Sequence, residues 1–146
     1  MSLKSVKKLL LVEDNPIDNQ RTQEAFRDIN KAVELHVASD GGEAMAYLHQ
    51  EGIHADAPRP DIILLELNLP KMDGREVLAQ IKKDESLKAI PTIILTSSEA
   101  EADILNCYQL RANTYFSKPA QFDAFLSLIN SINDFWLVKA KLPRQG

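Results

Sequence analysis

The stretch that most constrains the fold is residues 61–74, Asp-Ile-Ile-Leu-Leu-Glu-Leu-Asn-Leu-Pro-Lys-Met-Asp-Gly. Its four consecutive apolar residues, 62–65, lie between Pro60 and a Pro-x-x-Asp-Gly turn. A short apolar run bounded by turn residues is typical of a strand buried on both faces of a parallel sheet. Ligands of such sheets bind beyond the carboxyl ends of the strands, which is where Glu66 stands. On this stretch alone, an ordinary polar strand end is an equally good interpretation of Glu66.

Strand and helix patterns alternate along the rest of the chain. We expect strands at 7–12, 33–38, 62–65, 91–96 and 114–117, and helices at 16–29, 41–50, 75–83, 99–110 and from 122 to about 136. This alternation predicts an α/β fold, a doubly wound five-stranded parallel sheet of flavodoxin-like order 2-1-3-4-5 with helices on both faces. The 146 residues are expected to form a single domain, with a core of about residues 6–137 and a short C-terminal extension.

Composition excludes several classes of protein. A pI near 5.4 gives no electrostatic footprint for nucleic acid. The single Cys107 excludes an internal disulfide framework and a multi-cysteine metal site. The sequence shows no secretory signal and no apolar run near the ~18 residues that a membrane span needs. We therefore expect a cytoplasmic protein with neither a nucleic-acid nor a membrane partner.

Charged and hydroxyl side chains follow four of the expected strands. They are Glu13 and Asp14 after the first, Glu66 after the third, Thr96 at the end of the fourth and Lys118 after the fifth. Carboxylates after the first strand would repel a phosphate unless a cation intervened, and hard oxygen ligands suit Mg²⁺. Each residue alone would more often be a helix cap or a solvated strand end. At strand ends that share one crevice, their joint occurrence predicts a site for a metal-bound phosphoryl or carboxylate group.

Four motifs carry a resemblance to a known family. They are Val-Glu-Asp-Asn at 12–15, Leu-Asn-Leu-Pro-Lys-Met-Asp-Gly at 67–74, Thr96-Ser97, and Tyr-Phe-Ser-Lys-Pro at 115–119. Together they resemble the receiver domain of two-component response regulators, over about residues 6–137. The resemblance implies the receiver fold, a place in a phosphorelay and a signalling domain rather than an enzyme. It also implies roles for individual residues. The Mg²⁺ ligands would be Glu13, Asp14, Glu66 and, through its backbone carbonyl, Asn68. The switch residues would be Thr96 and Tyr115, Lys118 would contact the phosphoryl group, and Pro119 would be a cis-proline.

Glu66 departs from the family pattern, which places there an aspartate that a histidine kinase phosphorylates. Glutamate carries its carboxylate one bond further from the backbone, roughly 1.5 Å. Because in-line transfer depends on finer positioning than this, we expect phosphorylation to be lost or severely weakened, and Mg²⁺ binding to be weakened or absent. Glu66 could instead imitate a phosphoaspartate, with about one negative charge in place of nearly two. A natural receiver that takes no phosphate and an engineered phosphomimic are equally compatible with the sequence.

Two alternative functions remain open beside this one. The first is a pseudo-receiver adaptor that acts through protein contacts and never needed phosphate. The second, remote alternative is an Mg²⁺-dependent phosphatase, whose two aspartates would fall at Glu66 and Asn68.

The C-terminal region carries more apolar residues than one buried helix face uses. Leu128 and Phe135 lie seven apart on a second side, so we expect an interface that includes Phe125, Leu128, Phe135 and Trp136. The Pro-containing loop at 52–60 and the ending at 135–143 are similar to the stand-alone regulators of bacterial phytochrome kinases. That similarity implies a sensor histidine kinase of the phytochrome type as partner, and a homodimer through the last strand and helix.

Overall fold

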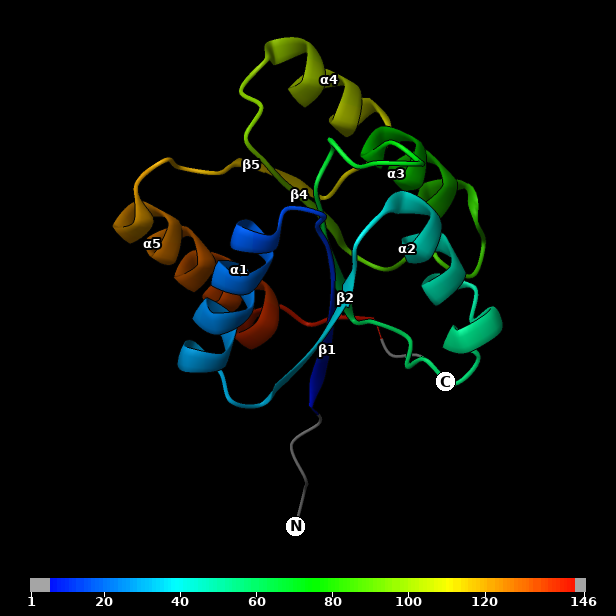
Figure 1. Ribbon diagram of the computed structural model, residues 1–146, viewed down its shortest axis with the longest axis horizontal. Coiled ribbons are helices and arrows are strands. Elements are labelled where there is room, and N and C mark those ends of the chain that lie inside the picture. The colour runs from blue at the N-terminus through cyan, green and yellow to red at the C-terminus, as the bar shows by residue number, and fades with distance from the viewer. Residues whose placement is uncertain (1–5, 144–146) are drawn as a thin grey trace.

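A five-stranded parallel sheet of order β2-β1-β3-β4-β5 forms the centre of the computed structural model, which describes residues 6–143 (Figure 1). This confirms the predicted fold and strand order. The strands are β1 (Lys7–Val12), β2 (Val33–Ala38), β3 (Ile62–Leu65), β4 (Thr92–Thr96) and β5 (Thr114–Ser117). The helices are α1 (Pro16–Ile29), α2 (Gly41–Leu48), η1 (Gly52–His54), α3 (Gly74–Lys83), α4 (Glu101–Gln109), α5 (Phe122–Ile132) and η2 (Asn133–Lys139).

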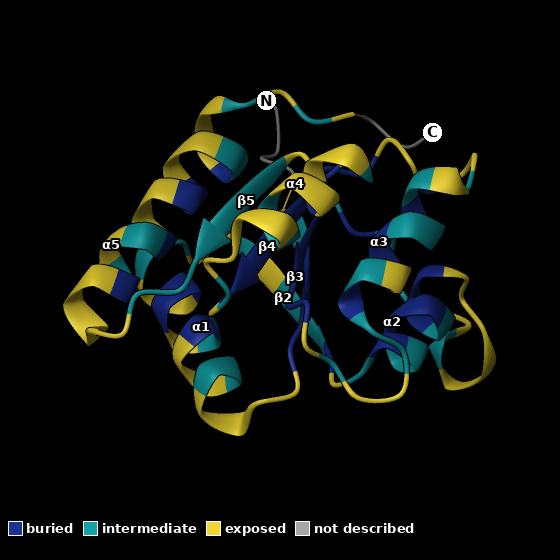
Figure 2. Ribbon diagram, turned by 90° about the horizontal axis from the view of Figure 1, so that it is seen from above, coloured by how far each residue is buried: buried dark blue, intermediate teal, exposed yellow. Residues whose placement is uncertain are grey.

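Both faces of the sheet are covered, which explains the unbroken apolar run of β3. Ile62 and Leu64 pack in a cluster with α1 and α5, whereas Ile63 and Leu65 pack in a second cluster with α2 and α3. Figure 2 shows these two helix pairs on opposite sides of the sheet, with the buried residues facing inward. Because each side of β3 meets a helix layer, every residue of this strand is apolar and buried.

The C-terminal helix differs from its prediction. A single helix from 122 to about 136 was expected, but α5 ends at Ile132 and the wider π-helical segment η2 continues to Lys139. The change of winding places Asn133 inside the molecule, where its Oδ1 accepts a hydrogen bond of 2.9 Å from Asn30 Nδ2 at the end of α1. Among residues 6–143, no helix has the length and apolar character that a membrane crossing requires.

The turn after β3 fixes α3 directly on the strand end. The Gly74 amide donates to Leu67 O at 2.8 Å, and the Asp73 side chain caps α3 through the Arg75 amide. A Cβ atom at Gly74 would lie 2.2 Å from Glu66 O and 2.6 Å from Leu67 Cα. The first residue of α3 is therefore a glycine because the backbone of Glu66 leaves no room for a side chain.

The close approach at Gly74 predicts a large cost for a single methyl group. We expect Gly74→Ala to lower the free energy of unfolding by about 2 kcal/mol or more, because backbone atoms would have to move. Gly42→Ala is the matched control, since the nearest atom to its Cβ is a side-chain oxygen at 3.3 Å. Urea unfolding of both variants measures the difference, and equal stabilities would contradict the steric explanation.

Candidate functional site

The carboxyl ends of β1, β3, β4 and β5 meet at one edge of the sheet. The strands pair in register up to this edge, with Val12 opposite Leu65, Leu65 opposite Ile94, and Thr96 opposite Ser117. Glu13, Glu66 and Lys118, each the residue after a strand, come together there, and Thr96 ends β4 beside them.

The ammonium of Lys118 is the centre of this site. Its Nζ donates to Glu13 Oε1 at 2.5 Å, to Glu66 Oε1 at 2.8 Å and to Asp18 Oδ2 at 3.0 Å. The side chains of Lys118, Glu13 and Glu66 are 6%, 3% and 8% exposed. Three carboxylates thus share one buried cation, whose three N–H donors are all used.

Burial and the neighbouring charges act against each other on these groups. Burial alone disfavours the ammonium, but the hydrogen bonds and charges of Glu13 and Glu66 outweigh it and raise the pKa of Lys118 above its ordinary value. Burial raises the pKa of Glu13, and the hydrogen bond from Lys118 offsets this only in part. Lys118 is therefore fixed in its charged form, and the Glu13 carboxylate depends on it.

The second oxygen of Glu66 is held by its own turn. Oε2 accepts hydrogen bonds from the amides of Leu67 at 2.8 Å and Asn68 at 3.3 Å. Among the hydrogen bonds of the described residues, none joins Glu66 to the buried hydroxyl of Thr96, whose Oγ1 lies 3.5 Å from the Ser98 amide. Glu66 therefore reaches Lys118 and does not reach Thr96.

Two of the four predicted metal ligands share one hydrogen-bond partner. Glu13 and Glu66 face Lys118, whereas Asp14 and Asn68 are exposed. Within the described part of the chain, no group of three or more His, Cys, Asp or Glu side chains is placed to hold a metal ion. Carboxylates are suitable ligands for Mg²⁺, but here an ammonium lies among them. Glu13 and Glu66 each direct one carboxylate oxygen at Lys118, and the predicted set of metal ligands stays a prediction.

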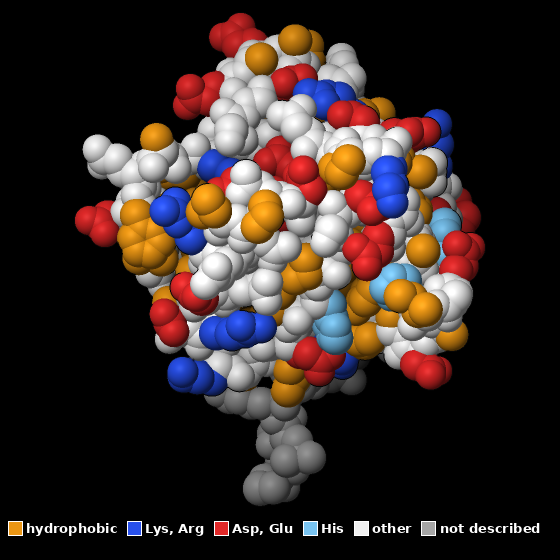
Figure 3. All heavy atoms as spheres, viewed as in Figure 1, with side chains coloured by type: hydrophobic (Ala, Val, Ile, Leu, Met, Phe, Trp, Pro, Cys, Tyr) orange, Lys and Arg blue, Asp and Glu red, His pale blue; other side chains and the backbone are white. Residues whose placement is uncertain are grey.

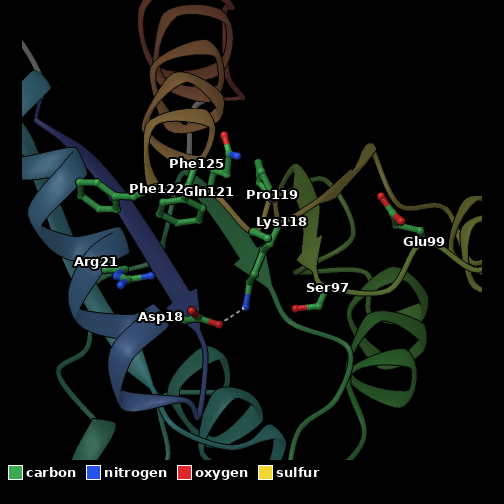
Figure 4. A pocket seen from close by; sticks show the side chains of 10 residues that line it. Asp18, Arg21, Ser97, Glu99, Lys118, Pro119, Gln121, Phe122 and Phe125 are labelled. Carbon is green, nitrogen blue, oxygen red and sulfur yellow. Dashed lines mark hydrogen bonds and ion pairs between the residues drawn. The ribbon is translucent and has the colours of Figure 1, made fainter.

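Asp18 belongs to the site although the sequence analysis missed it. It lies in the first turn of α1, where the Asn15 side chain caps the helix by accepting from the amides of Ile17 and Asp18. Figure 4 shows Asp18 pointing across the crevice toward Lys118. Its place in the first turn after the acidic pair was a signal available in the sequence, because that turn begins at the carboxyl edge of the sheet.

Tyr115 lies on β5 and is anchored to the loop between β4 and α4. Its hydroxyl donates to Ser98 O at 3.0 Å, and the Ser117 hydroxyl donates to the same carbonyl oxygen at 3.0 Å. Partial burial raises the pKa of Tyr115, so its hydroxyl stays protonated and acts as a donor. The predicted switch tyrosine is thus turned inward, toward the segment that follows Thr96.

The prediction of a cis-proline is wrong for this structure. No peptide bond between residues 6 and 143 is cis, so the Lys118–Pro119 bond is trans. The trans form of an X–Pro bond is favoured by about 0.5–1 kcal/mol. Lys118 reaches its three carboxylates from this trans arrangement.

The four predicted interface residues differ in exposure. Phe125 is buried in the cluster between the sheet, α1 and α5, so the structure contradicts its assignment to an interface. Its position in α5 turns it toward the core, a direction that helical spacing alone left open. Leu128 and Trp136 are partly buried and pack against the same cluster. Phe135 is 56% exposed, and its ring meets that of Trp136 edge to face, with 5.2 Å between the ring centroids.

The surface carries charges of both signs. Figure 3 shows acidic and basic side chains interspersed on one face, and no broad basic patch among the described residues of that face. Beside Lys118, the structure has a crevice of about 440 Å³. Its walls include Asp18, Arg21, Ser97, Glu99, Gln121 and Phe122, which Figure 4 labels.

Comparisons with known proteins agree with the fold and the motifs. The family described as "Response regulator receiver domain" matches residues 9–130. Response regulator Rcp1 of Synechocystis sp. is 43% identical over 137 residues, which cover 94% of this chain and 93% of that protein. A probable methanogenesis regulatory protein, FilR2 of Methanothrix harundinacea, is 38% identical and covers 88% of this chain and 83% of its own length.

Solved structures show the same architecture. The phosphorylated cyanobacterial phytochrome response regulator RcpA superposes with a TM-score of 0.91 at 49% identity, covering 94% of this chain and 99% of its own. The Mn²⁺-bound form of Rcp1 gives a TM-score of 0.91 at 43% identity with the same coverage. Thus at least one similar protein binds a divalent metal, whereas the carboxylates of this chain face an ammonium.

Removing the ammonium predicts a pH-dependent loss of stability. We expect Lys118→Met to lower the free energy of unfolding by about 3–5 kcal/mol near neutral pH, because buried carboxylates lose their cation. In the folded variant the buried carboxylates favour their protonated form. The loss of unfolding free energy therefore becomes smaller as the pH falls toward 4.5, the ordinary pKa of a glutamate such as Glu13. Urea unfolding across this pH range measures the deficit.

Lys71→Met is the control for this experiment. The Lys71 ammonium lies 3.6 Å from Asp40 but is 76% exposed, so its loss is expected to cost no more than about 1 kcal/mol. A deficit of Lys118→Met that stays constant with pH would contradict the assignment of Lys118 as the neutralising cation.

Proposed function

Because this chain belongs to the response regulator receiver domain family, we propose that it is a signalling receiver whose site is set by Glu66 without a phosphoryl group. The observation that carries this proposal is the hydrogen bond of 2.8 Å from Lys118 Nζ to Glu66 Oε1. In the family pattern, this lysine contacts the phosphoryl group on the acceptor aspartate. Here Lys118 instead donates its hydrogen bond to the unmodified carboxylate of Glu66.

The contacts of Glu66 also support the loss of phosphoryl acceptance. Oε1 faces the ammonium, and Oε2 accepts from the amides of Leu67 and Asn68. A nucleophilic oxygen would have to give up one of these hydrogen bonds in a site where Glu66 is only 7% exposed. The extra bond of the glutamate side chain, roughly 1.5 Å, displaces the carboxylate further from in-line geometry.

The imitation of a phosphoaspartate is proposed to be partial. Glu66 brings about one negative charge where a phosphoryl group carries nearly two. It engages Lys118 but makes no hydrogen bond to Thr96 in the structure. We therefore infer that the receiver is held between its two signalling states: Lys118 is hydrogen-bonded to the carboxylate at position 66, whereas Thr96 is not.

The partner we propose is a sensor histidine kinase of the phytochrome type, in the cytoplasm. The support is similarity to the cyanobacterial phytochrome response regulator RcpA over 94% of this chain. We also propose a homodimer through β5 and the C-terminal helix. Phe135 and Val138, 56% and 61% exposed, provide an apolar surface there that a second copy would cover.

A phosphate-independent adaptor is the second candidate. The observation that favours it is the lack of a hydrogen bond between Glu66 and Thr96, because an incomplete imitation need not affect the switch. A magnesium-dependent phosphatase has little support. Its nucleophile and second acid would be Glu66, which is bonded to Lys118, and Asn68, which is not an acid.

Phosphorylation is the direct test of the role of Glu66. We expect no stable phosphoryl increment after incubation with acetyl phosphate and Mg²⁺, and a clear increment for Glu66→Asp, because the shorter carboxylate restores the family geometry. Intact-mass spectrometry measures both, and Glu66→Gln serves as the negative control. A stable increment on Glu66 itself would overturn the proposal. If Glu66→Asp is phosphorylated with no change in oligomeric state or kinase binding, the adaptor is favoured.

The dimer has its own test. We expect Phe135→Glu to lower the dimer affinity by at least about tenfold, since it puts a charge into an apolar interface. Analytical ultracentrifugation measures the association, and Ile53→Glu is the control because Ile53 is 93% exposed in η1, outside the proposed interface. A dimer of unchanged affinity in Phe135→Glu would exclude this surface.

A further inference from the structure

Arg75 joins helix α3 to helix α4. It is the second residue of α3, and its Nη1 donates to Asp73 Oδ1 at 3.0 Å. Its Nη2 and Nε donate to Asp103 Oδ1 in α4 at 2.7 and 3.3 Å. The side chains of Arg75 and Asp103 are 30% and 24% exposed. A planar guanidinium suits this double contact, which a lysine could not reproduce.

Asp103 also contacts the loop between β4 and α4. Its Oδ2 accepts a hydrogen bond of 2.6 Å from the Ser98 hydroxyl. Ser98 and then Arg75 lower the pKa of Asp103, which is therefore a carboxylate at neutral pH. The carbonyl oxygen of the same Ser98 accepts from Tyr115. A continuous set of polar contacts thus runs from α3 through α4 and the loop to β5.

The α3 end of this set is fixed by strand β3, which Glu66 follows. Gly74 packs against Glu66 O, so the place of Arg75 follows from β3. Among the hydrogen bonds of residues 6–143, the hydroxyl of Thr96, the predicted switch residue, contributes only the 3.5 Å contact of its Oγ1 with the Ser98 amide. The loop is therefore held more closely through Arg75 than through Thr96.

We propose that Arg75 is a positioning residue: acting through Asp103 and Ser98, it fixes Tyr115 and the start of α4. The inference rests on the proposed function, because a receiver whose Glu66 takes no phosphoryl group needs another constraint on this segment. The ion pair supplies that constraint at all times. It makes the arrangement of the β4–α4 segment sensitive to the charges at positions 75 and 103, and insensitive to phosphoryl donors.

Hydrogen exchange of the full chain tests this role. The amides of Ser98 and Ala100 bond to the Thr96 and Ser98 hydroxyls, so they report directly on the loop. We expect amides 97–105 to exchange about tenfold faster in Arg75→Gln and in Asp103→Asn. The double variant should be no faster than the single ones, since both remove the same pair. Glu85→Gln, which breaks the exposed 2.8 Å pair with Lys88, should leave these amides unchanged.

Three results would overturn the proposal. The first is an exchange rate of amides 97–105 in Arg75→Gln within about twofold of that in the unsubstituted chain. The second is additive effects of the two substitutions in the double variant. The third is an equal rise in the exchange rate of the α1 amides, which would indicate general destabilisation. The exchange experiment contains no phosphoryl donor. Its failure would therefore leave the acetyl phosphate result standing, and phosphorylation of Glu66 would leave the exchange result standing.

Discussion

The ion pairs of Lys118 are the interaction on which the site depends. Glu13, Asp18 and Glu66 come from three different parts of the chain, and only a cation makes their close approach tolerable. The ammonium leaves an excess of two negative charges, so each carboxylate also needs local donors. Glu66 finds them in the amides of its own turn, and Glu13 accepts from the Asn15 amide. The carboxylates at this edge of the sheet are therefore stabilised both by the Lys118 ammonium and by backbone amides.

The topology of the sheet explains why so few residues are enough to build this site. Parallel strands bring all their carboxyl ends to one edge, so single residues after β1, β3 and β5 meet without any long loop. For the same reason, a change at one strand end acts on the others. The methylene that distinguishes Glu66 from aspartate moves a charge relative to Lys118, and through Lys118 relative to Glu13 and Asp18.

Sequence reasoning succeeded where the signal is local or follows from topology. Apolar runs and helical spacing are local, and they predicted the five strands, whereas the order of the sheet was predicted from the doubly wound fold type. The meeting of Glu13, Glu66 and Lys118 follows from parallel pairing. What failed depends on packing that no local pattern encodes. The direction of Phe125 and the π-helical winding at Asn133 are decided by how the C-terminal segment packs on α1. The link from Arg75 to Asp103 joins positions 28 residues apart.

The retention of the family residues around Glu66 does not require that the reaction be retained. Lys118 is needed to neutralise Glu13 and Asp18, whatever stands at position 66. Tyr115 donates to the loop after β4, which Arg75 holds from the other side through Asp103. Each has a structural task in the absence of a phosphoryl group, and loss of Lys118 would leave the Oε1 atoms of the buried Glu13 and Glu66 without this hydrogen-bond donor. Among the three predicted switch and phosphoryl-contact residues, the Thr96 side chain has the weakest polar contact, 3.5 Å from the Ser98 amide. Thr96 is thus the position where freedom from phosphate should first appear, because its hydroxyl has the least left to do.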